Sequence, residues 1–287
     1  MFLVGLMLCR NEDWVVGLTA RVALKWCDKL VVFDHASSDR TSEILSEIES
    51  EYPGKLIRIR EDNAVWFEMQ YRQRMLDAGR AAGGTHFAIV DADEVLTNNL
   101  LPVIRDASEK LTPGLVLEAW MPACWKSLEF YRSDRSVWSR VWLSTVFKDH
   151  PTLRWETRAG YDFHHRHPFG STIAQHRPFS NSGGVMHLQF VNRRRLKAKH
   201  ALYKMTERVR WPDRETVDAV DRKYHQAIDE TNVAVSSVHP TWWTGYEDLM
   251  KYIDIGDRPV WQEQECKRLM DAYGPGHFIG LNLYGVV

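Results

Sequence analysis

The first hundred residues alternate between short apolar runs and segments with helical spacing, and this alternation constrains the fold more than any other feature. The apolar runs, interpreted as strands, cover 3–8, 29–33, 55–59 and 87–90. The segments with helical spacing lie at 11–26, around 44–48 and at 68–82. A β-α-β order with crossovers of this length is typical of a parallel sheet wound with helices. We therefore predict an α/β domain whose ligands bind at the carboxyl ends of the strands.

The run from Phe87 to Val90 breaks abruptly into three acids, Asp91, Asp93 and Glu94. Carboxylates that follow a buried strand lie at the mouth of an α/β sheet, where ligands bind. Because the strand ends there, Asp91 and Asp93 can turn toward one cation, and Mg²⁺ or Mn²⁺ prefers carboxylate and phosphate oxygens. The alternative is that Asp93 and Glu94 cap the following helix, a common position for acids.

A second polar cluster, Asp34 to Thr41, follows the strand that ends at Phe33. The sequence has no GxGxxG after its first strand, which argues against a dinucleotide site of that type, and no GxxxxGK[ST], which argues against a P-loop. A nucleotide can still bind at the strand ends if a metal ion neutralises its phosphates.

Taken in order, three strand-end signals resemble those of the GT-A glycosyltransferases, and more narrowly the family 2 type that uses nucleotide sugars. The signals are Asn11-Glu12, Val32-Phe33-Asp34 with Ser37, Asp39 and Thr41, and Asp91-Ala92-Asp93. The resemblance covers about residues 1–100 and is closest to small bacterial and phage proteins of this type. They share something like the His187-Leu188-Gln189 strand with Lys199 and Tyr203 beyond it. It implies a GT-A, Rossmann-like fold with a helical C-terminal extension.

The resemblance also implies roles for residues on the nucleotide side of the site. Leu8, Cys9 and Arg10 would contribute mainly backbone to the base pocket. Asn11 would also bind the nucleotide, and Asp34 would accept a hydrogen bond from the base. The alternative for Asp34 is a cap on the following helix. Arg74 would lie near the nucleotide, and Arg72 competes with it for this role.

On the diphosphate side, the resemblance gives roles to Asp91-Ala92-Asp93 and to two later residues. Asp91 would contact the ribose or reach the metal through water, and Asp93 would contact the metal and the diphosphate. His187 would complete the metal shell, or serve as a core histidine. Lys199 would close on the diphosphate, although the basic run at 193–210 also fits a solvated helix face.

The predicted function is a metal-dependent glycosyltransferase that moves a sugar from a UDP- or GDP-sugar to an acceptor hydroxyl. The acceptor would be a glycan, a small molecule or a modified DNA base. An inverting enzyme needs a carboxylate base, which in the family often lies in a Glu-Asp pair. This chain has no such pair before Glu247-Asp248, so Glu156 and Asp162 are the nearest substitutes and the stereochemical outcome stays open.

Two other functions fit parts of the pattern. A metallohydrolase would use Asp91, Asp93 and the histidines, and would hold zinc or iron tightly. A non-catalytic carbohydrate- or nucleic-acid-binding module would need none of this chemistry. The clustered acids argue against the module, because like charges at one site repel each other and have little structural use.

Composition and charge set the remaining expectations. A net charge of −1 provides no global attraction to nucleic acid or membranes. The four cysteines are scattered without zinc spacing, which suits a reducing cytosol. No apolar run approaches the ~20 residues of a membrane span. We expect a cytoplasmic protein with a catalytic domain at 1–191, divided near residue 100 into nucleotide and acceptor halves, and a helical extension at 192–287 packed on it.

Shorter signals predict further local features. The helix at 68–82 should face inward with Met75, Leu76 and Gly79. We expect a strand at 183–191, a helix that Asn192 caps and that runs to about residue 210, and a second helix at 214–230. The run 164–167 contains three histidines, but irregular spacing argues against zinc, so we interpret it as a polar loop that lines the acceptor cleft.

Overall fold

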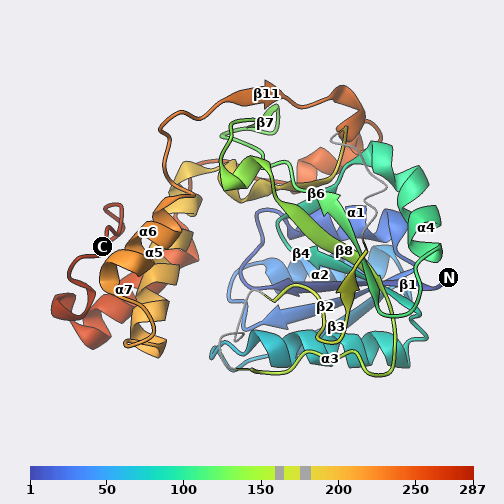
Figure 1. Ribbon diagram of the computed structural model, residues 1–287, viewed down its shortest axis with the longest axis horizontal. Coiled ribbons are helices and arrows are strands. Elements are labelled where there is room, and N and C mark those ends of the chain that lie inside the picture. Colours follow the sequence, from blue (N-terminus) through green and yellow to red (C-terminus); the bar gives the residue numbers. More distant parts are fainter. Residues whose placement is uncertain (159–164, 175–181) are drawn as a thin grey trace. The chain divides into compact units, whose positions relative to one another are not determined.

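The computed structural model describes residues 1–158, 165–174 and 182–287, and the chain divides into two compact units (Figure 1). Unit 1 comprises Met1–Pro122, Ser139–Leu188 and Val238–Asp254. Unit 2 comprises Ala123–Trp138, Gln189–Ser237 and Ile255–Val287. The predicted division at residue 191 and the packing of the extension on the catalytic domain stay predictions.

Unit 1 is built around one mixed sheet of seven strands in the order β3-β2-β1-β4-β8-β6-β9. Strands β1 to β4 are parallel, as predicted, while β8 runs antiparallel to both β4 and β6. A separate pair is formed by β5 and β10. The strands are β1 (Leu3–Cys9), β2 (Lys29–His35), β3 (Leu56–Glu61), β4 (His86–Asp91), β5 (Glu94–Leu96), β6 (Leu115–Trp120), β8 (Trp142–Lys148), β9 (Thr172–Ile173) and β10 (Val185–His187).

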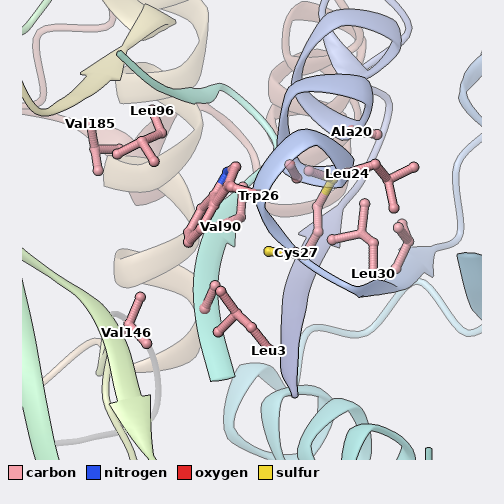
Figure 2. Packing of buried hydrophobic residues seen from close by; sticks show 14 of the residues in the cluster. Leu3, Ala20, Leu24, Trp26, Cys27, Leu30, Val90, Leu96, Val146 and Val185 are labelled. Carbon is pink, nitrogen blue, oxygen red and sulfur yellow. The ribbon is translucent and has the colours of Figure 1, made fainter. Parts of the chain in front are cut away.

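Helices cover both faces of this sheet. Helices α1 (Val16–Trp26), α2 (Thr41–Glu51) and α4 (Leu101–Glu109) share one apolar cluster with the sheet, and α3 (Glu68–Ala81) belongs to the other. Because β1 is central, its alternate residues enter the two clusters and all seven are buried. Figure 2 shows part of the first cluster, where side chains from α1 meet those of β1, β2 and β4.

The close approach of α3 to β4 depends on a glycine. A Cβ atom at Gly79 would lie 2.6 Å from the Phe87 ring, so a larger residue would push the helix away from the sheet. Met75 and Leu76 of the same helix are buried beside it. The predicted inward face of this helix, which these three residues form, is therefore confirmed.

Unit 2 contains three helices and one short antiparallel pair of strands. Its elements are α5 (Arg193–Arg210), α6 (Val217–His225), α7 (Trp261–Tyr273), β7 (Phe130–Arg132) and β11 (Val235–Ser237). The start of α5 is fixed by Asn192, whose side chain accepts a hydrogen bond from the Arg195 amide. Ala201 and Met205 of α5 pack against Cys266 and Leu269 of α7 in a small apolar core.

The predicted α/β class with helices in the C-terminal part is confirmed, and the sheet is consistent with a Rossmann-like GT-A fold. Three predicted boundaries are wrong. The first helix begins at Val16 because Asn11 adopts a left-handed conformation, with φ of +53°. The strand predicted to run to Val191 ends at His187, where a 3-10 turn starts. The last-but-one helix ends at His225 instead of Glu230.

Within the part of the chain that the structure describes, no helix combines the length and apolar character needed to cross a bilayer.

Candidate active site at the strand ends

The ends of β1, β2 and β4 place two groups of polar side chains on the same edge of the sheet. In the strand register, Cys9 pairs with Asp34 on one side and Leu8 pairs with Asp91 on the other. Since neighbouring strands lie about 4.8 Å apart, the backbones of the two aspartates are separated by roughly 10 Å. We call the group around Asp34 the β2 tip and the group around Asp91 the β4 tip.

The β2 tip is organised by the side chain of Asn11. Its Oδ1 atom accepts hydrogen bonds from the amides of Ser38, at 2.7 Å, and Asp39, at 3.3 Å. The Asn11 amide in turn donates to the Ser37 hydroxyl at 2.9 Å. Asparagine tolerates the left-handed backbone that this turn requires, which explains the residue type.

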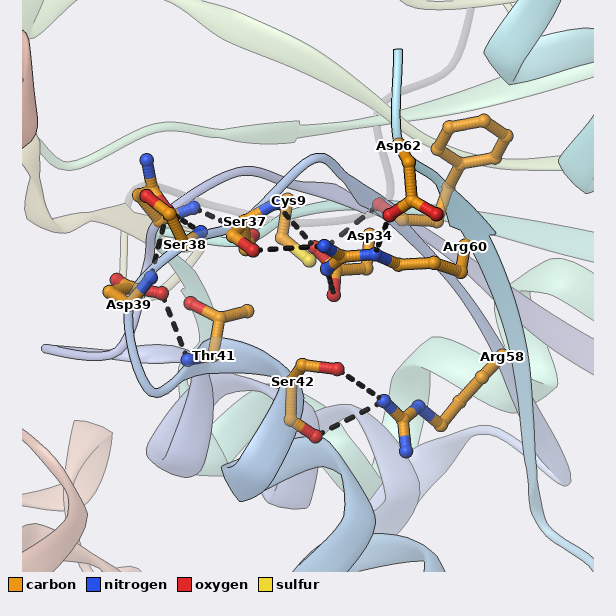
Figure 3. Close-up of polar contacts among 12 residues, drawn as sticks. Cys9, Asp34, Ser37, Ser38, Asp39, Thr41, Ser42, Arg58, Arg60 and Asp62 are labelled. Atoms are coloured by element: carbon orange, nitrogen blue, oxygen red, sulfur yellow. Dashed lines mark hydrogen bonds and ion pairs between the residues drawn. The ribbon is translucent and has the colours of Figure 1, made fainter. Parts of the chain in front are cut away.

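Asp34 lies at the centre of the β2 tip and is almost completely buried. Its Oδ2 atom accepts a hydrogen bond from Arg60 at 2.6 Å, and its Oδ1 atom accepts one from the Ser37 amide at 3.3 Å. Arg60 also donates to the Ser37 carbonyl and to Asp62, and its side chain is 40% exposed (Figure 3). The guanidinium therefore pairs with the buried carboxylate while it remains in contact with water.

An aromatic group adjoins the β2 tip. The ring of Phe33 stacks on Tyr71, and His35 lies against both Tyr71 and Trp66. The His35 Nε2 atom hydrogen-bonds to the Asn63 carbonyl at 2.9 Å. Burial lowers the pKa of His35, so the ring favours its neutral form.

Three predicted nucleotide residues lie beside this aromatic group. The Sγ atom of Cys9 is 3.6 Å from the Phe33 carbonyl, and burial raises the pKa of this thiol. Arg10 donates to the Ala64 carbonyl at 3.1 Å. Arg74 pairs with Glu61 at 2.9 Å, and its guanidinium lies 4.8 Å from the centre of the Phe33 ring. Their contact with a nucleotide stays a prediction.

The β4 tip is held together by Arg166, which the segment 165–174 brings to the sheet. Its Nη1 atom donates to Asp91 and to Glu94, both at 2.8 Å. Its Nη2 atom donates to Glu94 at 2.5 Å and to the Ile89 carbonyl at 3.0 Å. Its Nε atom donates to the Ser144 carbonyl at 2.8 Å. The five N–H groups of the guanidinium therefore all have acceptors.

A second arginine approaches Asp91 from α3. Arg72 donates to Glu68 at 2.7 Å and lies 3.4 Å from the Oδ1 atom of Asp91. Burial acts to raise the pKa of Asp91, but the charges of Arg166 and Arg72 outweigh it and the pKa is lowered. For Glu94, burial prevails over Arg166 and the pKa is raised. Of the two competing arginines, Arg72 is therefore the one in contact with the acids, whereas Arg74 lies beside Phe33.

Asp93 faces a different partner from Asp91. Its Oδ1 atom lies 3.4 Å from the Nε2 atom of His187, which pairing of β10 with β5 places opposite Glu94. The Asp93 carbonyl also accepts a hydrogen bond from the Leu188 amide at 2.8 Å. Two neighbouring ligands of one octahedral ion at about 2.1 Å stand roughly 3 Å apart, so this pair fits one side of a metal shell.

The remaining predicted ligand is Asp91, whose two carboxylate oxygens face arginines. Among the described residues, no group of three or more His, Cys, Asp or Glu side chains could hold a metal ion. Mg²⁺ is commonly bound by one or two carboxylates together with substrate phosphates, and Asp93 with His187 fits that mode. Metal binding by Asp91, Asp93 and His187 stays a prediction.

The other predicted residues are spread over the chain. Glu156 pairs with Arg154 and Arg158, whose hydrogen bonds lower its pKa. Asp162 lies outside the described residues. Lys199 lies on α5 in unit 2. In the basic run of that helix, Arg194 forms a bidentate pair with Glu263.

Comparison with known proteins adds little to this geometry. No protein-family model matches the sequence, and neither does any curated protein. Among solved structures, an S. aureus TarS fragment is 11% identical over 97% of this chain and 89% of that chain, with a TM-score of 0.40. The same fragment in complex with UDP is 13% identical over 52% of this chain and 47% of that chain, with a TM-score of 0.34. This chain spans about half of the complete TarS structure, at 12% identity and a TM-score of 0.41. Because these TM-scores are low, any inference about activity must come from the geometry of the site itself.

The sequence patterns missed three residues that shape the site: Arg60, Glu68 and Arg166. Arg166 lies within the histidine-rich run 164–167, for which the sequence predicts only a polar loop lining the acceptor cleft. In the structure, His165 stacks on Phe169 and His167 hydrogen-bonds to Ser171, so these rings support the segment that carries the arginine. The available signal was the charge imbalance of three acids at a strand end, which requires a cation from elsewhere.

Proposed function

We propose that the protein is a metal-dependent glycosyltransferase that transfers a sugar from a nucleoside-diphosphate sugar to an acceptor hydroxyl. The nucleoside would lie at the β2 tip and the diphosphate at the β4 tip. The proposal is supported by the strand register, in which Asp34 and Asp91 flank the end of β1. A separation of roughly 10 Å between the two strands suits a nucleotide that spans β1 from its base to its phosphates.

The charge balance of the β4 tip is the observation that carries the proposal. The described side chains that meet there include four carboxylates and two guanidinium groups: Glu68, Asp91, Asp93 and Glu94 with Arg72 and Arg166. The formal charges of these six described side chains sum to minus two. Hard divalent cations prefer carboxylate oxygens, so this excess of acids supports a bound Mg²⁺ or Mn²⁺.

Asp93 and His187 would hold the ion, with the remaining positions filled by diphosphate oxygens and water. When bound, the ion supplies Lewis-acid neutralisation of the departing diphosphate. Asp34, which is paired with Arg60, would offer a carboxylate oxygen as acceptor to an N–H group of a uracil or guanine base. Asp91, the last residue of β4, and Ala92, which follows it, would contact the ribose.

The acceptor hydroxyl must lose its proton as it attacks, and we propose a carboxylate as its base. Glu156 is ionised and held by two arginines, while Asp162 is the other candidate. The acceptor would be a glycan, a small molecule or a modified DNA base, and a direct-displacement mechanism would invert the anomeric carbon. Lys199 would assist at the diphosphate.

A thermal-shift screen of UDP- and GDP-sugars with Mn²⁺ tests this function. Ligand at about 100 times its dissociation constant should add roughly 2.7 kcal/mol to the free energy of unfolding. Asp93→Asn should abolish this shift and the slow release of nucleoside diphosphate. The matched control Asp77→Asn changes an exposed carboxylate of α3 and should leave both intact. A full panel of nucleotide sugars that produces no shift with Mn²⁺ or Mg²⁺ present would contradict the proposal.

A further inference from the structure

Arg166 places a positive charge against two of the carboxylates at the β4 tip. Its guanidinium bridges Asp91 and Glu94, and its side chain is only 14% exposed. The two bonds to Glu94 are parallel and bidentate, the arrangement that gives arginine its strongest carboxylate contacts. The positive charge is therefore fixed in place.

The same guanidinium is anchored to the sheet as well as to the acids. Its remaining donors reach the carbonyls of Ile89 in β4 and Ser144 in β8. Because each of the five N–H groups has an acceptor, Arg166 cannot donate to a phosphate without losing an existing bond. It differs in this respect from an arginine that binds a diphosphate directly.

The acids consequently divide into two kinds. The carboxylates of Asp91 and Glu94 accept hydrogen bonds from Arg166. Glu94 also accepts one from the Asp91 amide at 3.0 Å. Asp93 instead faces an imidazole. Counted over the described residues alone, a divalent ion that reaches the tip by itself meets one carboxylate and one imidazole outside the reach of Arg166, and these are too few ligands for a hard cation.

We propose that Arg166 is a built-in counter-cation that withholds Asp91 and Glu94 from metal, so that the β4 tip takes a divalent ion only together with a diphosphate. The inference rests on the proposed function for the identity of the diphosphate, but its first test needs no nucleotide. Arg166 acts through the two acids and is a positioning residue.

Removal of this charge should create a metal site. Arg166→Gln changes the balance of the described side chains from minus two to minus three and frees oxygens of Asp91 and Glu94. Without nucleotide, Mn²⁺ should bind the variant at least about tenfold more tightly than it binds the wild type, as measured by the electron paramagnetic resonance of free Mn²⁺. An affinity within twofold of the wild type overturns the proposal.

Two further variants separate the charge from the shape of the side chain. Arg166→Lys keeps the charge and should leave Mn²⁺ binding weak in the absence of nucleotide, whereas an increase equal to that of Arg166→Gln contradicts the charge explanation. The matched control is Arg80→Gln, because Arg80 also bridges a carboxylate, Asp149, and two carbonyls. This control should bind Mn²⁺ as the wild type does.

If Arg166→Gln does not fold, Glu94→Gln tests the charge explanation by removing a negative charge in place of a positive one. This variant leaves the described charges at minus one and should weaken Mn²⁺ binding in the presence of UDP or GDP at least about fivefold. Unchanged binding overturns the proposal.

The two proposals fail separately. A wild-type protein that binds no nucleotide while Arg166→Gln gains a Mn²⁺ site refutes the function alone. A wild type that binds Mn²⁺ with nucleotide while Arg166→Gln gains nothing refutes the inference alone.

Discussion

Strands β2 and β4 both pair with β1, and each has an aspartate at or next to its last residue that pairs with an arginine. At the β2 tip the partner, Arg60, is 40% exposed, comes from the next strand along the chain and meets one buried carboxylate. At the β4 tip the partners, Arg72 and Arg166, are at most 14% exposed and meet several carboxylates. The arginine of the β2 tip is in contact with solvent, whereas the two arginines of the β4 tip are nearly buried.

This difference teaches which interactions water can replace. If an exposed guanidinium is lost, water molecules can solvate the carboxylate that it leaves. If a buried guanidinium is lost, an ionised carboxylate remains in a medium that solvates it poorly. Substitutions at the β4 tip should therefore cost more stability than those at the β2 tip. A diphosphate–metal complex should bind at the β4 tip, where carboxylates and guanidinium groups are already paired.

The largest effect is expected for Arg72→Met. The change leaves Glu68, whose side chain is 3% exposed, without its arginine and should lower the free energy of unfolding by about 3–5 kcal/mol. Urea denaturation monitored by circular dichroism measures it. The control is Arg105→Met, whose pair with Asp28 is about one-third exposed and should cost less than about 1 kcal/mol. Equal losses in the two variants would remove the contrast between buried and exposed pairs.

The next effect concerns the turn of the β2 tip. Asn11→Ala removes the acceptor for two amides and places alanine at φ of +53°, so we expect a loss of about 2–3 kcal/mol. Asn11→Gly accepts the backbone conformation and should recover about 1 kcal/mol of that loss. Urea unfolding curves of the two variants measure the loss in Asn11→Ala and the recovery in Asn11→Gly. A glycine variant no more stable than the alanine variant would rule out the backbone contribution.

A smaller loss is expected for Arg60→Met. Because Arg60 is 40% exposed, water can take its place at Asp34, and the free energy of unfolding should fall by only about 1 kcal/mol. The same denaturation series measures it. If the loss reached that of Arg72→Met, the two tips would be energetically alike and the comparison would fail.

The smallest effect is the pH dependence of stability that His35, beside the β2 tip, contributes. Because burial lowers the pKa of His35 in the fold, its contribution to stability is present above its ordinary value of 6.5 and is lost as the pH falls through the folded-state pKa. His86, with a pKa lowered to about 4, adds a slope of the same sign.

The measurement compares the wild type with His35→Gln in urea midpoints at pH 7.5 and 5.5. The wild type should lose more stability on acidification than the variant, because the variant retains only the slope of His86 and other groups. Identical slopes would show that His35 does not couple protonation to folding. The arginines of the β4 tip remain charged throughout this range.

The sequence predicted the frame of the molecule well because the signals are local. Periodicity located the parallel strands and the inward face of α3, and the residue type of Asn192 located the start of α5. It placed Asp34 and Asp91 at strand ends, since the polar residue that follows an apolar run marks where a strand leaves the core. It could not place Arg166, which reaches Asp91 across 75 positions of the chain.

Boundaries failed where a conformation depended on distant groups. The delay of α1 to Val16 follows from the turn that Asn11 forms with Ser38, a contact over 27 positions. The early end of β10 at His187 coincides with the hydrogen bond from Leu188 to Asp93. Neither partner lies within the window that a periodic pattern covers.

By itself, the sequence determined the α/β architecture and the position of acids at the ends of its strands, because hydrophobic spacing and turn chemistry act over a few neighbouring residues. Tertiary structure alone decided which cation meets which acid. The pairing of Arg166 with Asp91 and Glu94, and of His187 with Asp93, depends on segments that only the folded sheet brings together. Electrostatic interactions act through space, so their partners cannot be identified from spacing along the chain.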